Sequence, residues 1–280
     1  MVGWMAHRLG RKMVMTHHGD LVMPAGLWNR FVQLTVGYLL DRGAASADVI
    51  TIHSQDYADH SDYLRPHLSK VEAIYPPVVI PRVQPEEIAA WREELGLTNR
   101  RIVGFAGRFV EEKGFDFLLE AVPMVVEQVP DVMFAYAGEH RVVYESFYER
   151  LRPLWEANQD HLMMMGLITD HQKLANFYGM CDVFALPSRT DCFPSVQIEA
   201  LLCGTPMVAT NIPGAREVVR VTEMGLLVEP RNPRALADGL IEVLKNTDHY
   251  TRSYEHVRSH FDTQRTVTEY ERLFERLVTG

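Results

Sequence analysis

The side chains best suited to chemistry or ligand binding are two carboxylates, Asp191 and Glu199, which lie eight residues apart. A short apolar run at 182–186 ends at Pro187 and is typical of a buried parallel strand. Apolar residues then recur at helical spacing over 196–202. The first acid therefore lies on a turn at the carboxyl end of a strand, where doubly wound sheets bind ligands, and the second lies on the following helix. Two acids held there can bind the hydroxyl groups of a ligand.

The start of that helix offers a second kind of contact. The backbone N–H groups from Phe193 to Val196 lack acceptors within the helix, so with the helix dipole they favour an anion such as a phosphate. Pro194 and Ser195 suit a first helical turn. In the alternative interpretation Asp191 only caps the helix and Glu199 is an exposed acid, and the pair alone does not decide between the two.

Two cations form a second cluster in the segment Gly-Arg-Phe-Val-Glu-Glu-Lys-Gly at 107–114. The segment follows a strand predicted at 101–106, so Arg108 and Lys113 are expected at the same sheet edge as the carboxylates. An arginine can bind two phosphate oxygens at once and a lysine supplies a point charge, a combination that suits a diphosphate. The alternative is a solvated loop in which the neighbouring Glu111 and Glu112 pair with the cations.

Strand and helix signals alternate in two blocks, which a proline-rich joint at 75–85 separates. The first block predicts strands at 12–16, 48–53 and 70–74, and helices at 24–45 and 54–64. The second block predicts strands at 101–106, 132–137, 161–165, 182–186, 207–210 and 225–228. Its predicted helices are 86–95, 115–129, 142–157, 172–179, 196–202, 216–219, 233–245, 248–260 and 263–277. Such alternation implies an α/β fold with parallel sheets and right-handed crossovers.

Composition narrows the class of protein. With 47% hydrophobic and 23% charged residues the chain is an ordinary globular sequence, and a net charge of -9 argues against a nucleic-acid partner. Three cysteines without metal-ligand spacing, and a start that lacks the apolar core of a signal peptide, favour the cytoplasm. The apolar stretch 27–40 is interpreted as a helix packed in the core. Peripheral contact with the inner membrane face is the alternative for that stretch.

The motifs taken together resemble the carboxyl-terminal domain of family 4 retaining glycosyltransferases of the GT-B fold. The resemblance spans most of residues 100–230 and is carried by 107–114, Ala137-Gly138, Met165-Gly166-Leu167, Tyr178, Asp182, Pro187-Ser188, the spaced carboxylates and Gly204-Thr205-Pro206. It implies a Rossmann-like donor-binding domain, a doubly wound parallel sheet, at 81–262. It also implies a partial Rossmann-like acceptor-side domain at 1–80 and a terminal helix, 263–280, that packs back on the latter.

The resemblance also assigns roles to residues. It implies that Arg108 and Lys113 clamp the donor diphosphate without a metal or any other cofactor, that Glu199 holds the ribose hydroxyls, and that Asp191 touches the donor sugar. Further donor-binding residues are Gly107, Gly138, Gly166, Leu167, Cys192, Phe193, Pro194, Ser195 and Val196, with the backbone near Gly166 and Leu167 at the nucleobase edge. Two departures stand out: Asp191 replaces the commoner Glu, and Pro194 replaces a Gly and removes one N–H.

A third motif lies near the start of the chain. The segment Thr16-His17-His18-Gly19-Asp20 follows a predicted strand and resembles the His-Gly segment of the family, which implies that His18 is a catalytic residue near the anomeric carbon. In the alternative both imidazoles only satisfy hydrogen bonds of the loop. Because little chain precedes this motif, we expect that the first part of the amino-terminal domain is absent and that its sheet exposes an edge strand.

The expected function is transfer of a glycosyl group from a nucleoside-diphosphate sugar to a sugar, lipid or small-molecule acceptor, with retention of configuration. Placed charges would stabilise the departing diphosphate. Two alternatives remain at this point: a nucleotide-sugar-binding fragment without catalysis, and a sugar-nucleotide epimerase of the same fold.

Overall fold

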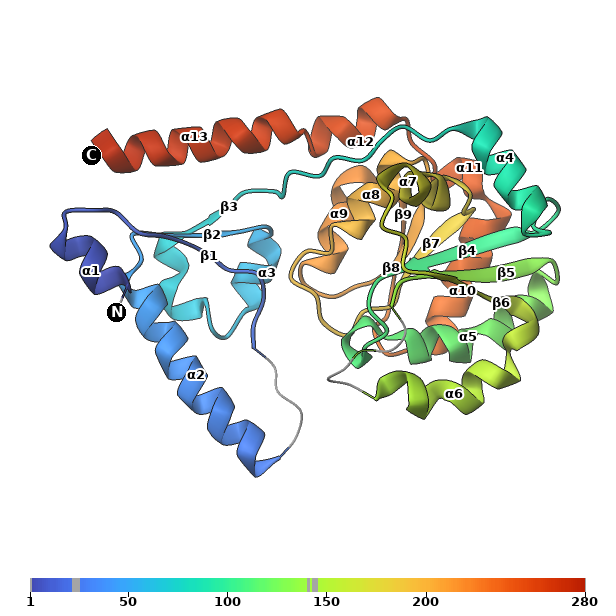
Figure 1. Cartoon of the computed structure of the whole chain (residues 1–280), viewed down its shortest axis with the longest axis horizontal. Coiled ribbons are helices and arrows are strands. Elements are labelled where there is room, and N and C mark those ends of the chain that lie inside the picture. Colours follow the sequence, from blue (N-terminus) through green and yellow to red (C-terminus); the bar gives the residue numbers. More distant parts are fainter. Residues whose placement is uncertain (1, 22–25, 140–141, 143–145, 280) are drawn as a thin grey trace. The chain divides into compact units, whose positions relative to one another are not determined.

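Two parallel sheets organise the chain (Figure 1). The computed structural model describes residues 2–21, 26–139, 142 and 146–279. The chain divides into a first unit, residues 1–77 with 263–280, and a second unit, residues 78–262. The division between residues 77 and 78 falls within the proline-rich segment 75–85. An α/β fold with parallel sheets was predicted, and it is confirmed.

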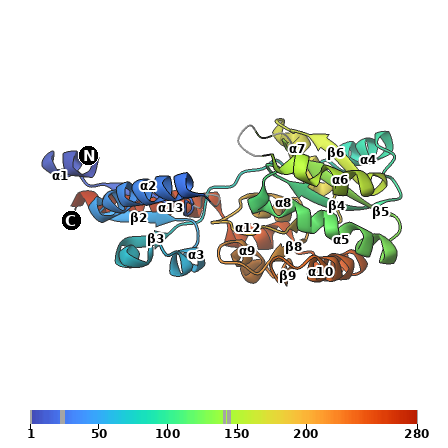
Figure 2. The ribbon, with the colours of Figure 1, turned by 90° about the horizontal axis from the view of Figure 1, so that it is seen from below.

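The first unit holds a three-stranded sheet in the order β1-β2-β3, with strands Val14–Thr16, Val49–Ile52 and Val71–Ala73. Its helices are α1 (Val2–Arg8), α2 (Leu27–Ser46), α3 (Gln55–His60), the 3-10 helix η1 (Arg65–Lys70) and α13 (Thr263–Thr279). Thr16 of β1 pairs in register with Thr51 of β2, so the chain leaves both strands at the same edge. Figure 2 shows this unit from below, with α13 in red.

One buried cluster of the first unit joins residues from both ends of the chain. Val49, Ile74 and Leu273 form a buried cluster, against which Val14, Tyr270 and Leu277 pack. Leu273, Tyr270 and Leu277 belong to α13, so a helix from the far end of the chain closes the sheet of this unit.

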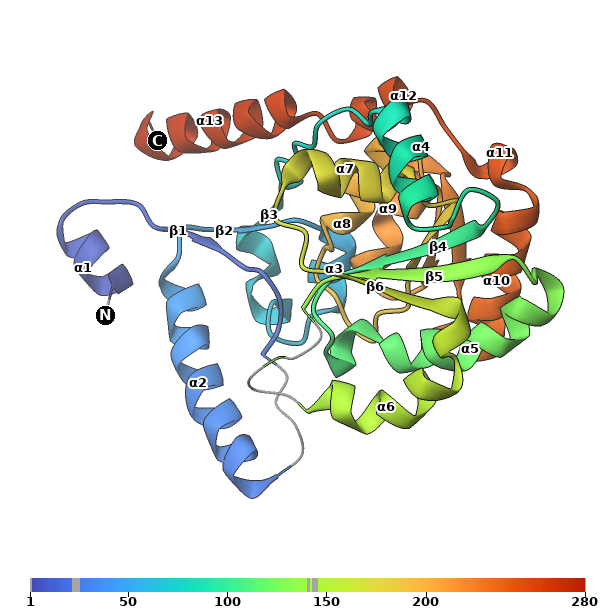
Figure 3. The ribbon, with the colours of Figure 1, turned by 45° about the vertical axis from the view of Figure 1, so that its right-hand side comes forward.

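Helix α2 does not match its predicted environment. The stretch 27–40 was expected to pack in a core, but Trp28, Phe31 and Leu34 are 73%, 60% and 67% exposed. In Figures 1 and 3 the first turns of α2 project away from the strands of their own unit. The prediction was wrong because apolar residues lie on several sides of this helix, and the described residues bury few of them. Among the described residues, no helix combines the length and hydropathy that crossing a bilayer requires.

The second unit holds a six-stranded parallel sheet in the order β6-β5-β4-β7-β8-β9. In chain order its strands are β4 (Arg101–Ala106), β5 (Val132–Ala137), β6 (Leu162–Gly166), β7 (Val183–Leu186), β8 (Met207–Thr210) and β9 (Gly225–Val228). Its helices are α4 (Pro85–Glu94), α5 (Phe115–Gln128), α6 (Phe147–Ala157), α7 (His171–Gly179), α8 (Val196–Leu202), α9 (Ala215–Thr222), α10 (Pro233–Lys245), α11 (Thr247–Tyr250) and α12 (Tyr254–His260). Two 3-10 turns complete the unit, η2 (Glu111–Lys113) and η3 (Gln159–His161).

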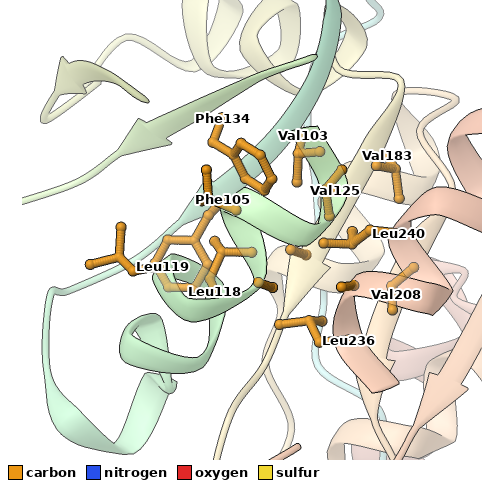
Figure 4. Close-up of a cluster of buried hydrophobic side chains, with 14 of the residues drawn as sticks. Val103, Phe105, Leu118, Leu119, Val125, Phe134, Val183, Val208, Leu236 and Leu240 are labelled. Atoms are coloured by element: carbon orange, nitrogen blue, oxygen red, sulfur yellow. The ribbon is translucent and has the colours of Figure 1, made fainter. Parts of the chain in front are cut away.

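Helices α5 and α10 cover one face of this sheet and bury its main core (Figure 4). Phe105 and Phe134 from the sheet, Leu118 from α5 and Leu240 from α10 are each at most 3% exposed. The apolar residues that recur at helical spacing over 115–129 form a stripe that is buried except at Val126, which is half-buried; its residues are Phe115, Leu118, Leu119, Val122, Val125, Val126 and Val129. A tightly packed core of this size holds the strand ends, and the loops on them, in fixed positions.

Two predicted helices are shorter than expected. In one a serine lies at the end of the helix, and in the other a serine caps the start of a separate helix. The helix predicted at 54–64 ends at His60, where the Ser61 hydroxyl donates to the Asp20 carboxylate and accepts from a backbone N–H three residues on. The helix predicted at 248–260 is two helices, because the Ser253 hydroxyl caps α12 by accepting from the His256 N–H.

Four other helices differ from the prediction or are described only in part. Helix α9, predicted at 216–219, is longer and spans Ala215–Thr222. Helix α1 was not predicted at all. The helix predicted at 142–157 is described from Phe147 onwards, and residues 143–145 lie outside the described residues. The predicted start of α2 at Pro24 also lies outside them.

Candidate functional site

The candidate site lies where the sheet of the second unit changes direction. From β4 the chain builds outwards through β5 to β6, and from β7 it builds the other way through β8 to β9. The segments 107–114 and 187–195 therefore leave the carboxyl ends of two neighbouring strands, β4 and β7. Loops that diverge from such a switch point leave a crevice, which is where open α/β sheets bind ligands.

Glycines let the loops after β4, β5 and β6 approach one another closely. The Gly107 N–H donates to the Ala137 carbonyl at 3.0 Å, and the Gly138 N–H donates to the Gly166 carbonyl at 2.9 Å. A Cβ on Gly138 would lie 2.0 Å from the Gly107 carbonyl oxygen, so no other residue type fits. Three of the predicted glycines thus form the floor of the crevice by backbone contacts.

A hollow of about 260 Å³ opens at this edge and is called here the switch-point hollow. Its lining residues are Ala106, Gly107, Arg108, Ala137, Gly138, Glu139, Leu167, Ile168, Leu174, Tyr178, Val196 and Glu199. Six of them were predicted from the sequence: Gly107, Arg108, Gly138, Leu167, Val196 and Glu199. The lining of the hollow combines apolar side chains with the carboxylates of Glu139 and Glu199 and the Arg108 guanidinium.

Glu199 is half-buried and is not the exposed helical acid of the alternative interpretation. Burial raises its pKa, while a hydrogen bond from the Tyr178 hydroxyl at 2.7 Å to Oε2 acts in the opposite direction. The Thr205 hydroxyl holds Tyr178 in turn by donating to its carbonyl at 2.6 Å. Sequence reasoning noted Tyr178 only as a motif residue, and its contact with Glu199 could not be predicted because it depends on how α7 packs on α8.

Asp191 contacts Lys113 and does not cap α8. The Lys113 Nζ lies 2.6 Å from Asp191 Oδ2, and the two side chains are 19% and 12% exposed. The Ser188 hydroxyl donates to the same oxygen at 3.4 Å. Helix α8 has no side-chain cap, so the capping alternative for Asp191 is wrong. The two predicted clusters are therefore joined directly by an ion pair.

Arg108 behaves differently from Lys113. Its Nη2 lies 3.3 Å from Glu112 Oε1, and the two side chains are 57% and 45% exposed, as the solvated-loop alternative predicted. Exposed pairs of this kind contribute little to stability, so a phosphate could replace Glu112 at small cost. Arg108 thus makes the loop contact that the alternative described, whereas Lys113 pairs with Asp191 instead.

The remaining predicted residues lie beneath or beside the hollow. Cys192, Phe193 and Pro194 are buried, and the Phe193 ring packs against Phe261 at 6.3 Å between centroids. Ser195 is exposed, and α8 begins one residue later. In the described part of the chain this run contributes only Val196 to the lining of the hollow.

The two histidines of the first unit have distinct environments. His17 is 9% exposed, its Nε2 lies 3.0 Å from Asp20 Oδ1, and its ring stacks on Tyr63. His18 is exposed at the carboxyl edge of β1, with its ring 5.4 Å from that of His53. The loop-bonding alternative therefore describes His17, and the exposed imidazole belongs to His18.

Asp20 fixes the loop that carries His18. Its carboxylate accepts from the Ser61 hydroxyl at 2.8 Å, and its N–H donates to the Tyr57 hydroxyl at 2.9 Å. Burial raises the pKa of Asp20, but the hydrogen bonds from His17 and Ser61 outweigh it and the net pKa is lowered. His53 is half-buried beside His18, and its own pKa is lowered, chiefly by burial.

A doubly wound sheet with cations, carboxylates and an apolar hollow at its switch point is the arrangement found in α/β proteins that bind small anionic ligands. Comparison with known families makes this specific. The sequence profile of the family described as glycosyl transferases group 1 matches residues 87–260, and the chain belongs to that family.

Related sequences agree with this assignment. D-inositol 3-phosphate glycosyltransferase of Corynebacterium urealyticum is 28% identical over 249 residues, which cover 84% of this chain and 58% of that protein. Phosphatidyl-myo-inositol mannosyltransferase of Mycobacterium leprae is 30% identical over 64% of this chain and 48% of that protein. The chain spans about half the length of the curated relatives that it matches.

Solved structures share the fold. The Anabaena protein Alr3699/HepE in complex with UDP-glucose superimposes with a TM-score of 0.79 at 22% identity, covering 100% of this chain and 75% of that one. Sucrose-phosphate synthase from Thermosynechococcus elongatus gives a TM-score of 0.74 at 25% identity, covering 99% and 71%. The predicted GT-B fold is confirmed.

Proposed function

We propose that this chain binds a nucleoside-diphosphate sugar in the switch-point hollow and transfers its glycosyl group to an acceptor hydroxyl with retention of configuration. The observation that carries the proposal is the 2.6 Å contact between Lys113 and Asp191 at the switch point. It brings the predicted phosphate-binding segment and the predicted sugar-binding carboxylate to one place.

The residues in and around the hollow suit, in turn, the nucleobase, the ribose and the diphosphate of such a donor. The apolar wall near Leu167 suits a nucleobase, and Glu199, held by Tyr178, suits the ribose hydroxyls because a carboxylate accepts two hydrogen bonds readily. Arg108 and Lys113 suit the diphosphate. A lysine ammonium has three donors, so Lys113 can keep its bond to Asp191 and still donate to a phosphate oxygen.

The chemistry that we propose is breakage of the bond between the anomeric carbon and the terminal phosphate oxygen. Negative charge then accumulates on the departing diphosphate, and Arg108 and Lys113 would stabilise it most strongly at that stage. The glycosyl group forms a bond to the acceptor oxygen, whose proton is released. His18 stays a predicted catalytic residue of the first unit, and the reaction is proposed to need no metal and no other cofactor.

The proposal is tested by titrating the protein with UDP, GDP and ADP and comparing two lysine variants. Lys113→Ala should weaken binding of the preferred nucleotide by about tenfold or more, because it removes a charge-assisted hydrogen bond to phosphate. Lys245→Ala, at the exposed end of α10, is the matched control and should leave the affinity unchanged.

Equal affinities in the two variants, or no binding of any of the three nucleotides by the unsubstituted protein, would contradict the assignment. EDTA should leave binding and donor turnover unchanged if no metal takes part. The configuration of the glycosidic bond in the product decides between retention and inversion.

We also propose that α2 contacts an anionic membrane surface. The charged residues of 1–40 are the cations Arg8, Arg11, Lys12 and Arg30 and the single acid Asp20, in a chain whose net charge is -9. In the first turns of α2 the exposed cation Arg30 accompanies exposed Trp28 and Phe31, and these two features favour binding to anionic lipid. A protein bound to a membrane through α2 could use an acceptor that is linked to a lipid of that membrane.

A further inference from the structure

Arg189 connects the two loops of the switch point, although no motif pointed to it. Its backbone N–H donates to the Glu112 carbonyl at 2.7 Å, and its Nη1 donates to the Glu111 carbonyl at 2.7 Å. The same guanidinium binds both carboxylate oxygens of Asp116, at 2.7 and 2.5 Å. One residue of the loop after β7 therefore holds Glu111 and Glu112 of the segment after β4 and Asp116 of the first turn of α5.

The contact is well shielded from water. The Arg189 and Asp116 side chains are 18% and 15% exposed, and the guanidinium lies 4.2 Å from the centroid of the Phe117 ring. A forked, partly buried pair that also stacks on an aromatic ring resists displacement more than an exposed pair such as Arg108 and Glu112 does. Arg189 is thus suited to hold geometry, whereas Arg108 can exchange partners.

The backbone beside the pair leaves little room for an alternative arrangement. Gly114, with φ of 69°, lies so close to Pro187 that a Cβ on it would be 2.0 Å from the Pro187 carbonyl oxygen. Lys113 precedes this glycine, and Asp191 lies two residues after Arg189. The clamp and the close backbone contact therefore both lie within a few residues of Lys113 on one loop and of Asp191 on the other.

We propose that Arg189 is a positioning residue of the donor site, which sets the place of Lys113 and Asp191 by clamping the segment 111–116 to the loop after β7. The inference rests on the proposed function and identifies what holds its phosphate-binding cation in register. A small displacement of a bound group can cost much of its effect, so the clamp acts on the diphosphate without touching it.

The test compares Arg189→Met, which keeps the apolar stem, with Arg189→Lys, which keeps the charge and loses the fork. Each variant is titrated with UDP, GDP and ADP and with the corresponding nucleosides, which carry no phosphate. The nucleosides report on the hollow around Leu167 and Glu199, and the diphosphates report on Lys113 as well. Arg234→Met is the matched control, because it removes an arginine from an exposed pair on α10.

We expect both Arg189 variants to bind nucleoside diphosphates about tenfold more weakly while nucleoside affinity changes less than about twofold. A ratio of diphosphate to nucleoside affinity that stays within about twofold of the unsubstituted protein would overturn the proposal. So would an equal loss for both kinds of ligand, because that result indicates general destabilisation.

A second arm needs no ligand. Amide hydrogen exchange in 110–117 and 188–191 should rise in Arg189→Met and stay unchanged in Arg234→Met. Unchanged exchange would overturn the clamp even if Arg189→Met binds diphosphates weakly. If the unsubstituted protein binds no nucleotide, the proposed function fails and so does the assignment of the clamp to a donor site.

Discussion

The two units contain parallel sheets of the same kind, but they differ in how many large hydrophobic side chains they leave exposed. In both sheets the inner strands β2, β5, β7 and β8 are buried along their length, and the edge strands β1, β3, β6 and β9 are half-buried or exposed. Fourteen of the sixteen large hydrophobic side chains that are exposed in the described part of the chain belong to the first unit. The first unit should therefore be the less stable of the two.

This contrast bears on function because the candidate residues differ in how firmly they are held. The Lys113 and Asp191 pair is anchored to strands of a large core, so its geometry persists without a ligand. His18 is positioned by the hydrogen bonds of Asp20 on a small sheet. We therefore expect a rigid donor site in the second unit and a less stable first unit.

The largest effect that we predict comes from a matched pair of leucines. Leu240→Ala in the main core should lower the free energy of unfolding by about 2 to 5 kcal/mol, because Leu240 is fully buried between α10 and the sheet. Leu34→Ala in α2 should change it by less than about 0.5 kcal/mol, because that side chain is 67% exposed. Chemical denaturation measures both values, and similar costs would mean that α2 is packed in solution.

A smaller effect concerns the exposed face of α2. Vesicles of phosphatidylcholine with phosphatidylglycerol should bind the protein at least about tenfold better than vesicles of phosphatidylcholine alone. A variant with Trp28→Ser and Phe31→Ser should lose that preference, and Phe274→Ser on α13 should keep it. Cosedimentation measures the binding. If the protein binds no vesicles and its elution volume in size-exclusion chromatography depends on concentration, the exposed face of α2 contacts a second copy of the chain. That result would contradict the membrane proposal.

The smallest effect follows from the pKa of Glu199. Burial raises that pKa above its ordinary value of 4.5. As the pH falls, the Glu199 carboxylate therefore becomes protonated at a higher pH than an exposed glutamate does. If the carboxylate binds ribose hydroxyls, affinity for a nucleoside-diphosphate sugar should fall severalfold as the pH falls through the raised pKa. Glu199→Gln should bind weakly at all pH values without this acidic limb. Titration calorimetry with UDP-glucose, GDP-mannose and ADP-glucose checks the effect, and an identical pH profile for both proteins would contradict the role.

The amino-acid sequence predicted the strands of the second unit well, because each strand is an apolar run with turn residues at both ends. It also predicted that Arg108, Lys113, Asp191 and Glu199 share a sheet edge, since the carboxyl ends of parallel strands meet there. Local pattern could not predict the clamp by Arg189 or the hydrogen bond from Tyr178. These contacts depend on how helices and loops far apart in the chain pack together.

Helix α2 is the instructive failure. Its apolar composition matches that of a core helix, but burial requires a partner surface that composition does not reveal. The prediction for α5 is right where the same reasoning fails for α2, because the apolar stripe of α5 faces α10 and the strands. Apolar residues at helical spacing thus predict a helix more reliably than they predict its surroundings.

The central claim is that a nucleoside diphosphate binds at the switch point of the second unit. It is tested most directly by amide hydrogen exchange with and without UDP, GDP or ADP. The account predicts that one of these nucleotides slows exchange in 107–114, 166–168 and 187–199 and leaves 27–46 unchanged. Protection confined to the first unit, or no protection in those segments with any of the three nucleotides, would contradict it.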